Sequence, residues 1–388
     1  MSSVDFHPYF QFSEPNKEIL LTEDRVIVKV SDSSYTGLGK VYLRLLPRPQ
    51  IEIRIRLDNA PFTDFSNSVD SVLLGSRSLD ISGFATQLTM STDKGTTLTW
   101  TPKKEPIIAF GDDNTPINSV IFHVFNFRNI IGTRRSFETV GEAKYGIEHV
   151  DLTSDDWRVE LRSLPSTNRT FGQLKEQGGF GLTHIGRFEK TDRSSFAGKE
   201  AQELLRALRF FLSFAKGIWC EPVCAVGFDN SGDHVCWELW SSPREPWHSP
   251  YSWFDPHHCE QLVDLFPGFM AKWNHEDWRE ALHEVIYWYL NANYSSRGID
   301  AGIILTQAAI ERLSHELAVR DRRLLSVNGF RDIRASDKFR LLFSTLGIPL
   351  DIPVETSELQ RLASNSQMNW LDAPHALTEI RNSLVHPE

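Results

Sequence analysis

Short runs in the first part of the chain alternate apolar with polar or charged side chains. This period of two is typical of half-buried antiparallel strands. The clearest runs are VIVKV at 26–30, VYLRLL at 41–46, IEIRIRL at 51–57 and VIFHVFNF at 120–127. Turn-forming residues, among them Pro47 and the stretch from Gly111 to Asn114, separate the runs. We therefore predict an antiparallel β-rich domain, a sandwich or a barrel, over residues 1–170.

The last third of the chain follows a helical period instead. Apolar positions recur at helical spacing over about 276–293, 300–320, 336–346 and 373–385. Asp300 and Ser336 stand where helix N-caps are expected, because their side chains can accept a hydrogen bond from the first turn. Residues 257–388 are thus predicted to form an all-α bundle.

The segment between these parts has a mixed pattern. Residues 172–195 are rich in glycine and charge, which favours a linker or a mobile loop. An amphipathic helix over 199–217 should end at Gly217, and two strand-like runs follow at 222–228 and 234–240. Because residues 241–256 are rich in proline and tryptophan, we place a boundary there. The prediction is a small mixed unit over 171–256 and an α+β fold class for the whole chain.

Length and charge restrict the classes of protein to which the chain can belong. A chain of 388 residues suits several domains better than one core. The formal net charge of −10 argues against a broad nucleic-acid-wrapping surface, although an enzyme with a few local cations remains compatible with it. The N-terminus lacks the basic start and apolar run of a signal peptide, and no long apolar stretch suggests a membrane span. We expect a cytoplasmic protein.

Two sets of residues resemble parts of known cofactor-binding motifs but do not match any such motif. The cysteines do not have the spacing of a paired zinc knuckle, so we predict buried thiols, no metal and no cofactor; they are Cys220, Cys224, Cys236 and Cys259. The run Gly37 to Lys40 lacks the full spacing of a phosphate-binding loop, and a hairpin turn is expected there.

The last helical segment, TEIRNSLVHPE, carries the candidate chemistry. Pro387 predicts a helix end at His386, because the residue before proline is pushed out of the α region. Asn382 and His386 then share one helix face, and the long side chain of Arg381 can reach the same space. An imidazole can transfer protons near neutral pH, a guanidinium can hold a phosphate, and an amide can orient either group. This combination suits RNA cleavage without a metal.

The pattern of arginine, asparagine, three residues and histidine on the last helix of an α-domain resembles the HEPN superfamily. Its ribonuclease members use an Arg-x4-His motif at a dimer interface, so the resemblance implies a homodimer with an RNA substrate. The segment Ala301 to Leu317 is similar to the long helix that carries an acidic or polar residue in many such domains, and Glu311 matches that position.

The order of parts resembles a second group as well. A strand-rich domain before a HEPN-like tail is similar to the ApeA-like anti-phage proteins of prokaryotes, and this implies RNA cleavage that arrests an infected cell, as a toxin does. HEPN domains usually continue with another helix after the motif, whereas this sequence stops two residues beyond His386. We therefore expect a truncated product or another segment in that place.

Alternatives to catalysis stay open. Arg381 and His386 are also what the dipole favours in the last turn of any helix, and Glu311 can simply pair with Arg312 or His315. A HEPN-like bundle can also dimerise or dock a partner without catalysis, while the N-terminal domain recognises a ligand. A cleft shared by Arg381, Asn382 and His386 would favour the enzyme.

Overall fold

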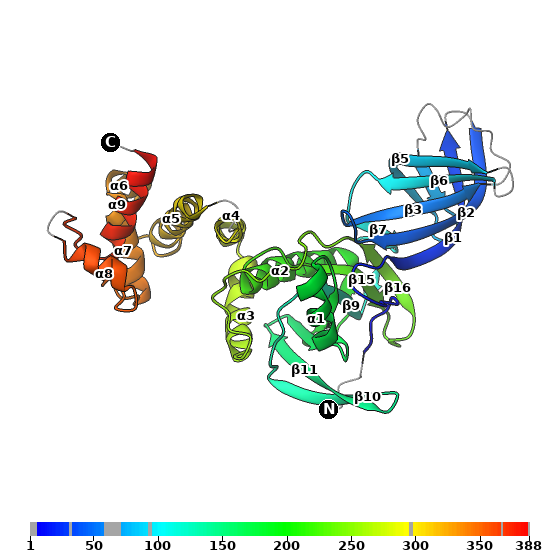
Figure 1. The fold of residues 1–388 in the computed structure, drawn as a ribbon, viewed down its shortest axis with the longest axis horizontal. Helices are drawn as coiled ribbons and strands as arrows, with labels where there is room; N and C mark the ends of the chain where they lie inside the picture. Colours follow the sequence, from blue (N-terminus) through cyan, green and yellow to red (C-terminus); the bar gives the residue numbers. More distant parts are fainter. Residues whose placement is uncertain are drawn as a thin grey trace. The chain divides into compact units, whose positions relative to one another are not determined.

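The computed structural model describes residues 6–30, 33–57, 71–91, 95–294, 298–365 and 368–386. These form two compact units, one of residues 1–249 with 253–267 and the other of residues 250–252 with 268–388. Strands dominate the N-terminal part and helices the C-terminal part, which confirms the α+β class (Figure 1).

The first unit begins with a closed β-barrel, drawn in blue in Figure 1. Around the barrel the order is β1 (Ile19–Val30), β2 (Ser33–Arg44), β3 (Gln50–Leu57), β6 (Gly95–Pro102), β5 (Leu79–Ser91) and β4 (Ser71–Leu74). Apolar members of the alternating runs, such as Val28, Val41 and Ile53, are fully buried. Of the intervening charges, Arg56 is exposed, whereas Glu52 is buried beneath its ion pairs with Arg44 and Arg54. The predicted strands and the barrel-like form are confirmed.

The expected hairpin at Gly37 to Lys40 is wrong, because these residues lie inside strand β2. A Cβ atom on Gly39 would stand 2.4 Å from Cγ1 of Val26, and one on Gly37 would stand 2.1 Å from the carbonyl oxygen of Arg56. Both glycines therefore allow close approach between barrel strands rather than a turn.

An eight-stranded antiparallel sheet forms the rest of the β structure. Its order is β10 (Arg134–Val140), β11 (Ala143–Thr153), β12 (Trp157–Ser163), β13 (Leu182–Lys190), β9 (Ser119–Phe125), β15 (Pro222–Phe228), β16 (Val235–Trp240) and β7 (Ile107–Phe110). A two-stranded sheet of β8 (Pro116–Ile117) and β14 (Phe196–Ala197) accompanies it, with helices α1 (Thr167–Gln177) and α2 (Gly198–Lys216). Helix α2 ends at Gly217, as predicted.

The linker predicted over Gly172 to Ser195 is wrong, because the end of α1 and strand β13 occupy most of it. Strands before and after residue 170 lie in the same eight-stranded sheet. The glycines of this segment serve a turn between α1 and β13, where Gly178 and Gly179 have φ values of 66° and 83°. Asn16 fixes this turn, because its Oδ1 accepts the N–H of Phe180 at 2.7 Å and its Nδ2 donates to the carbonyl of Gly178 at 3.1 Å.

Barrel and sheet share one hydrophobic core within the first unit. It includes Leu43 and Trp100 of the barrel together with Ile185 and Val226 of the sheet. An ion pair of 3.1 Å between Arg77, which follows β4, and Glu238 of β16 also joins them. The barrel is therefore held against the sheet by apolar packing and by a largely buried charge pair.

The second unit is helical. Its elements are α4 (Glu276–Ala292), α5 (Ile299–His315), a π-helical segment η3 (Glu316–Asp321), α6 (Val327–Asp332), α7 (Ala335–Leu346), α8 (Ser357–Ala363) and α9 (Ala373–Val385), after the end of α3 (Glu260–Trp273). The helices predicted from the period are confirmed. None of the helices in the described ranges has the length and apolar composition that a membrane crossing requires.

Two predicted N-caps are wrong. Gly298 caps α5 with a φ of 81°, and Arg334 caps α7 in an extended conformation. Asp300 and Ser336 instead lie in the first turns of these helices. The sequence pattern located both helices but misplaced each N-cap by two positions, as is usual for helix ends.

Candidate functional site

Helix α9 carries the predicted motif and has a defined start and end. Asp372 is its N-cap and accepts the backbone N–H of His375 at 2.9 Å. The helix ends with His386 as its C-cap, and the N–H of His386 donates to the carbonyl of Asn382 at 2.8 Å. The helix end predicted at His386 is confirmed.

The structure places the motif residues on this last stretch of helix. Arg381 and Asn382 are partly buried, and Nη1 of Arg381 donates to Oδ1 of Asn382 over a long 3.4 Å. His386 is exposed at the C-cap. The amide and the guanidinium are thus in contact, and the imidazole follows one turn later, open to solvent. Their catalytic role stays a prediction.

Glu311 lies on α5 and pairs with Lys338 rather than with Arg312 or His315. Its Oε1 accepts Nζ of Lys338 on α7 at 2.7 Å. The ammonium of Lys338 also lies 4.8 Å from the ring centre of Phe330. Helix α9 packs against both α5 and α7. Glu311 therefore belongs to the same three-helix group as Arg381, Asn382 and His386, with its charge held by Lys338.

A buried carboxylate at the end of α5 was not predicted. Glu316 is fully buried where the helix widens into the π-helical segment η3, and Arg312 bonds it at 2.8 Å. Arg312 also bonds Glu284 of α4 at 2.6 Å. Such π-helical turns occur frequently at functional sites. In sequence, Glu316 and Arg312 look like an ordinary surface pair four residues apart, so no signal distinguished them.

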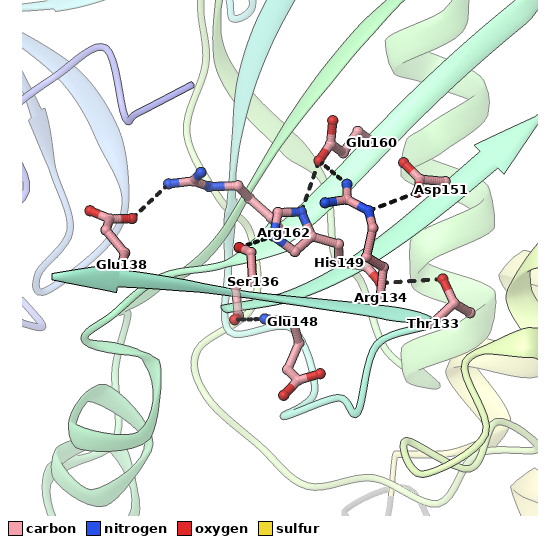
Figure 2. Close-up of polar contacts among 10 residues, drawn as sticks. Thr133, Arg134, Ser136, Glu138, Glu148, His149, Asp151, Glu160 and Arg162 are labelled. Atoms are coloured by element: carbon pink, nitrogen blue, oxygen red, sulfur yellow. Dashed lines mark hydrogen bonds and ion pairs between the residues drawn. The ribbon is translucent and has the colours of Figure 1, made fainter. Parts of the chain in front are cut away.

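A second polar cluster occupies one face of strands β10, β11 and β12 in the first unit (Figure 2). Ser136 bonds Nε2 of the buried His149 at 2.7 Å, and Nδ1 of His149 bonds Glu160 at 2.8 Å. Glu160 can only accept when it is ionised, so Nδ1 of His149 carries a proton and donates to Glu160. Arg134 donates to the same Glu160 oxygen at 2.7 Å.

Glu160 is held in its ionised form. Burial raises the pKa of its carboxyl, but the hydrogen bonds from His149 and Arg134 outweigh burial, and the pKa lies below its ordinary value. The order of serine, histidine and carboxylate matches that of a nucleophilic triad. In this sheet the same bonds tie the edge strand β10 to β11 and β12, a structural role that requires no substrate.

A cavity of about 370 Å³ adjoins the cluster. We call it the Arg162 cavity. Arg162 of β12 lines it and pairs with Glu138 of β10, with 3.1 Å between Nη2 and Oε2 (Figure 2). Its other walls combine apolar side chains with polar ones such as Ser166 and Thr170, and the apolar part includes Phe10, Phe12, Phe125 and Phe180. The sequence pattern did not indicate this cavity, because strands far apart in sequence and the N-terminal segment build it together.

Comparisons with known proteins match both units. A family model of the YopA central domain matches residues 112–252, and one of the YopA C-terminal domain matches residues 275–388. The chain is similar to YopA proteins. One relative, the SPbeta prophage-derived uncharacterized protein YopA of Bacillus subtilis (strain 168), is 27% identical over 401 residues, covering 100% of this chain and 86% of that protein. No solved structure matches the chain.

The two matched segments contain the two polar sites separately. The central segment holds Ser136, His149, Glu160 and the Arg162 cavity's ion pair, whereas the C-terminal segment holds Glu311 and the Arg381 to His386 motif. The name of this relative states no activity, and only the geometry of the two sites indicates their chemistry.

Proposed function

We propose that the second unit is a HEPN-type, metal-independent endoribonuclease. The observation that carries the proposal is helix α9, which ends at His386 and brings Arg381 and Asn382 into contact on the preceding turn. His386 acts as general acid or base, because its exposed imidazole can reach a 2′-hydroxyl or a leaving oxygen. Arg381 holds the phosphate, and Asn382 orients the guanidinium.

Glu311 acts as a positioning residue in this proposal. Its carboxylate is bound by Lys338 at 2.7 Å and so joins α5 to α7. Both helices support α9. Loss of the Glu311 charge would therefore affect RNA cleavage through the placement of α9 rather than through contact with the RNA.

A homodimer completes the proposed mechanism. One imidazole cannot readily serve as acid and base in the same step, and a symmetric partner supplies a second copy of His386. The helical unit leaves large apolar side chains exposed, including Ile299 at 81% and Leu371 at 81%.

The biological setting is proposed from the same resemblance. A HEPN-type ribonuclease behind a β-rich domain fits a prokaryotic anti-phage or toxin protein that cuts RNA in the cytoplasm. The prophage origin of the Bacillus subtilis relative supports a role in conflict between phage and host. The first unit would then sense the trigger.

Purified protein incubated with labelled RNA, with and without EDTA, tests the proposal. We expect cleavage that is indifferent to EDTA and products that end in a 2′,3′-cyclic phosphate, because 2′-hydroxyl attack requires no metal. His386→Ala and Arg381→Ala should each lower the rate by about 10² to 10⁴. Arg361→Ala, which removes a cation from the exposed helix α8, is the matched control and should retain the wild-type rate.

Undiminished cleavage by either motif variant, or equal cleavage of DNA, would show that α9 has an ordinary helix end. The second candidate function is then a non-catalytic dimerisation or ligand-binding protein. The Arg162 cavity favours it, since a pocket that combines aromatic walls with a few polar and charged groups is the usual form of a small-molecule site.

A further inference from the structure

The Arg162 cavity has the size and the wall chemistry of a ligand site. Small-molecule pockets commonly span about 300 to 1,000 Å³ and combine apolar walls with a few polar groups. The cavity measures about 370 Å³, and the rings of Phe10, Phe12, Phe125 and Phe180 contribute to its lining. An apolar ligand body of modest size therefore has matching walls.

The charged part of the lining carries both signs. Arg162 is only 1% exposed, and burying its charge is tolerable because Glu138 pairs with it at 3.1 Å. His7 lies at the mouth, 4.0 Å from the other Glu138 oxygen, and Glu14 also lines the cavity. With two carboxylates and one guanidinium on the lining, a ligand that is purely anionic is disfavoured. A buried guanidinium in turn disfavours a purely cationic ligand.

The paired charges are rigidly placed. Glu138 lies on the same face of β10 as Ser136, whose bond to His149 ties that strand to β11. Arg162 stands directly opposite His149 in the β11–β12 register, and the ring of Phe6 covers its guanidinium at 5.2 Å. A site held in this way is preorganised, so little ordering cost opposes binding.

We propose that the Arg162 cavity binds a small zwitterion with an apolar body, of the class of free apolar α-amino acids. The ligand carboxylate binds Arg162, the ammonium binds Glu138, and the side chain lies among the phenylalanine rings. Each charge of the ligand thus meets its opposite on the wall. This inference concerns the first unit and does not depend on the ribonuclease proposal.

L-Phenylalanine is the probe, titrated calorimetrically into the full-length protein without RNA. Two analogues isolate each charge, because 3-phenylpropanoate lacks the ammonium and phenethylamine lacks the carboxylate. We expect one site for L-phenylalanine and binding at least about tenfold weaker for each analogue, equivalent to about 1.4 kcal/mol. If either analogue binds as tightly as L-phenylalanine, the proposal that the ligand is a zwitterion is wrong. If millimolar L-phenylalanine, L-leucine and L-tryptophan all give no binding heat, the proposal of an amino-acid site is wrong.

The Glu138→Gln variant locates the binding. The variant removes the contact for the ammonium, so the affinity for L-phenylalanine should fall about tenfold. The affinity for 3-phenylpropanoate, which has no ammonium, should stay the same or rise. Glu148→Gln is the matched control. Glu148 lies on the neighbouring strand β11 and bonds Arg135 and the N–H of Gly132. If Glu148→Gln weakens L-phenylalanine as much as Glu138→Gln does, the ligand does not occupy the Arg162 cavity.

Discussion

Two buried histidines lie in the middle of the eight-stranded sheet. His123 of β9 accepts the N–H of Tyr9 at its Nε2 over 3.2 Å, and its Nδ1 lies 2.9 Å from the carbonyl of Cys224. His184 of β13 contacts the Thr183 hydroxyl at 3.0 Å. Burial lowers the pKa of His123 to about 4 and that of His184 to about 3. Both rings are therefore neutral in the folded protein at pH 7.

Acid should destabilise the first unit through these rings. The unfolded chain binds their protons below about pH 6.5, whereas the folded chain does so only near pH 4 for His123 and pH 3 for His184. The contribution of the two neutral histidines to the free energy of unfolding is therefore complete above about pH 6.5. It falls by roughly 1.4 kcal/mol per pH unit for each histidine as the pH drops toward 4. Urea unfolding followed by circular dichroism measures this slope.

His184→Phe should flatten the slope, since phenylalanine keeps the ring contact with Phe127 and cannot take a proton. His257→Ala removes an exposed histidine and should leave the slope unchanged. If His184→Phe retains the full pH dependence, the ring of His184 is not the group that titrates.

At the residue scale the sequence predicted local chemistry but not chemistry shared between strands. The helical spacing of Arg381, Asn382 and His386 could be derived because all three lie on one short helix. Glu160 and Arg162, in contrast, look like exposed charges alternating with apolar residues in VELRS. They face a buried polar cluster only because β10 and β11 lie beside β12, and that pairing depends on turns and contacts far away in the sequence.

Helix α9 depends on one side chain at its start. Asp372 caps it through the N–H of His375 and binds Arg340 of α7 with both oxygens, at 2.7 and 3.0 Å. Burial raises the pKa of Asp372, but the Arg340 and His375 hydrogen bonds outweigh burial and leave the pKa below its ordinary value. One carboxylate thus fixes both the first turn of α9 and its attachment to α7.

Asp372→Ala should therefore loosen α9. We expect a loss of about 1 to 3 kcal/mol, from the missing cap and the missing ion pair together. Asp372→Asn retains an oxygen for the cap and should lose roughly half as much. Hydrogen exchange of the α9 amides measures the effect, with the α4 amides as an internal reference. Equal protection of α9 in wild type and Asp372→Ala would contradict this role.

At the scale of elements, the hydrophobic period located strands and helices correctly, whereas local composition did not. The period of two located barrel strands such as β1 and β3, and the helical period located α4, α5, α7 and α9. The glycine content of residues 172–195 suggested a linker, yet β13 is a central strand. Its glycines are required by a turn that Asn16 holds, and a contact across so much sequence leaves no local signal.

At the scale of the whole molecule, the division between the two units falls close to the gap between the two family-model matches. The central-domain match ends at residue 252 and the C-terminal match begins at residue 275, while the units divide around residues 250 to 268. The barrel strands, from Ile19 to Pro102, precede both matches. The two proposals therefore concern different units, with the Arg162 cavity in the first and α9 in the second.

The proposed ribonuclease mechanism predicts that the whole chain associates into a dimer. If paired motifs cleave RNA, two α9 helices lie near a two-fold axis, and Val385, 38% exposed beside His386, faces its own copy. Val385→Asp would then place two carboxylates against each other in an apolar contact, so sedimentation should show the dimer dissociation constant raised at least about tenfold. RNA cleavage should fall in parallel at low protein concentration. Val354→Asp adds the same charge at a site 80% exposed before α8, and it should leave both measurements unchanged. A wild-type protein that is strictly monomeric and still cleaves RNA would refute the paired mechanism without refuting the nuclease, because each active site would then be complete within one chain.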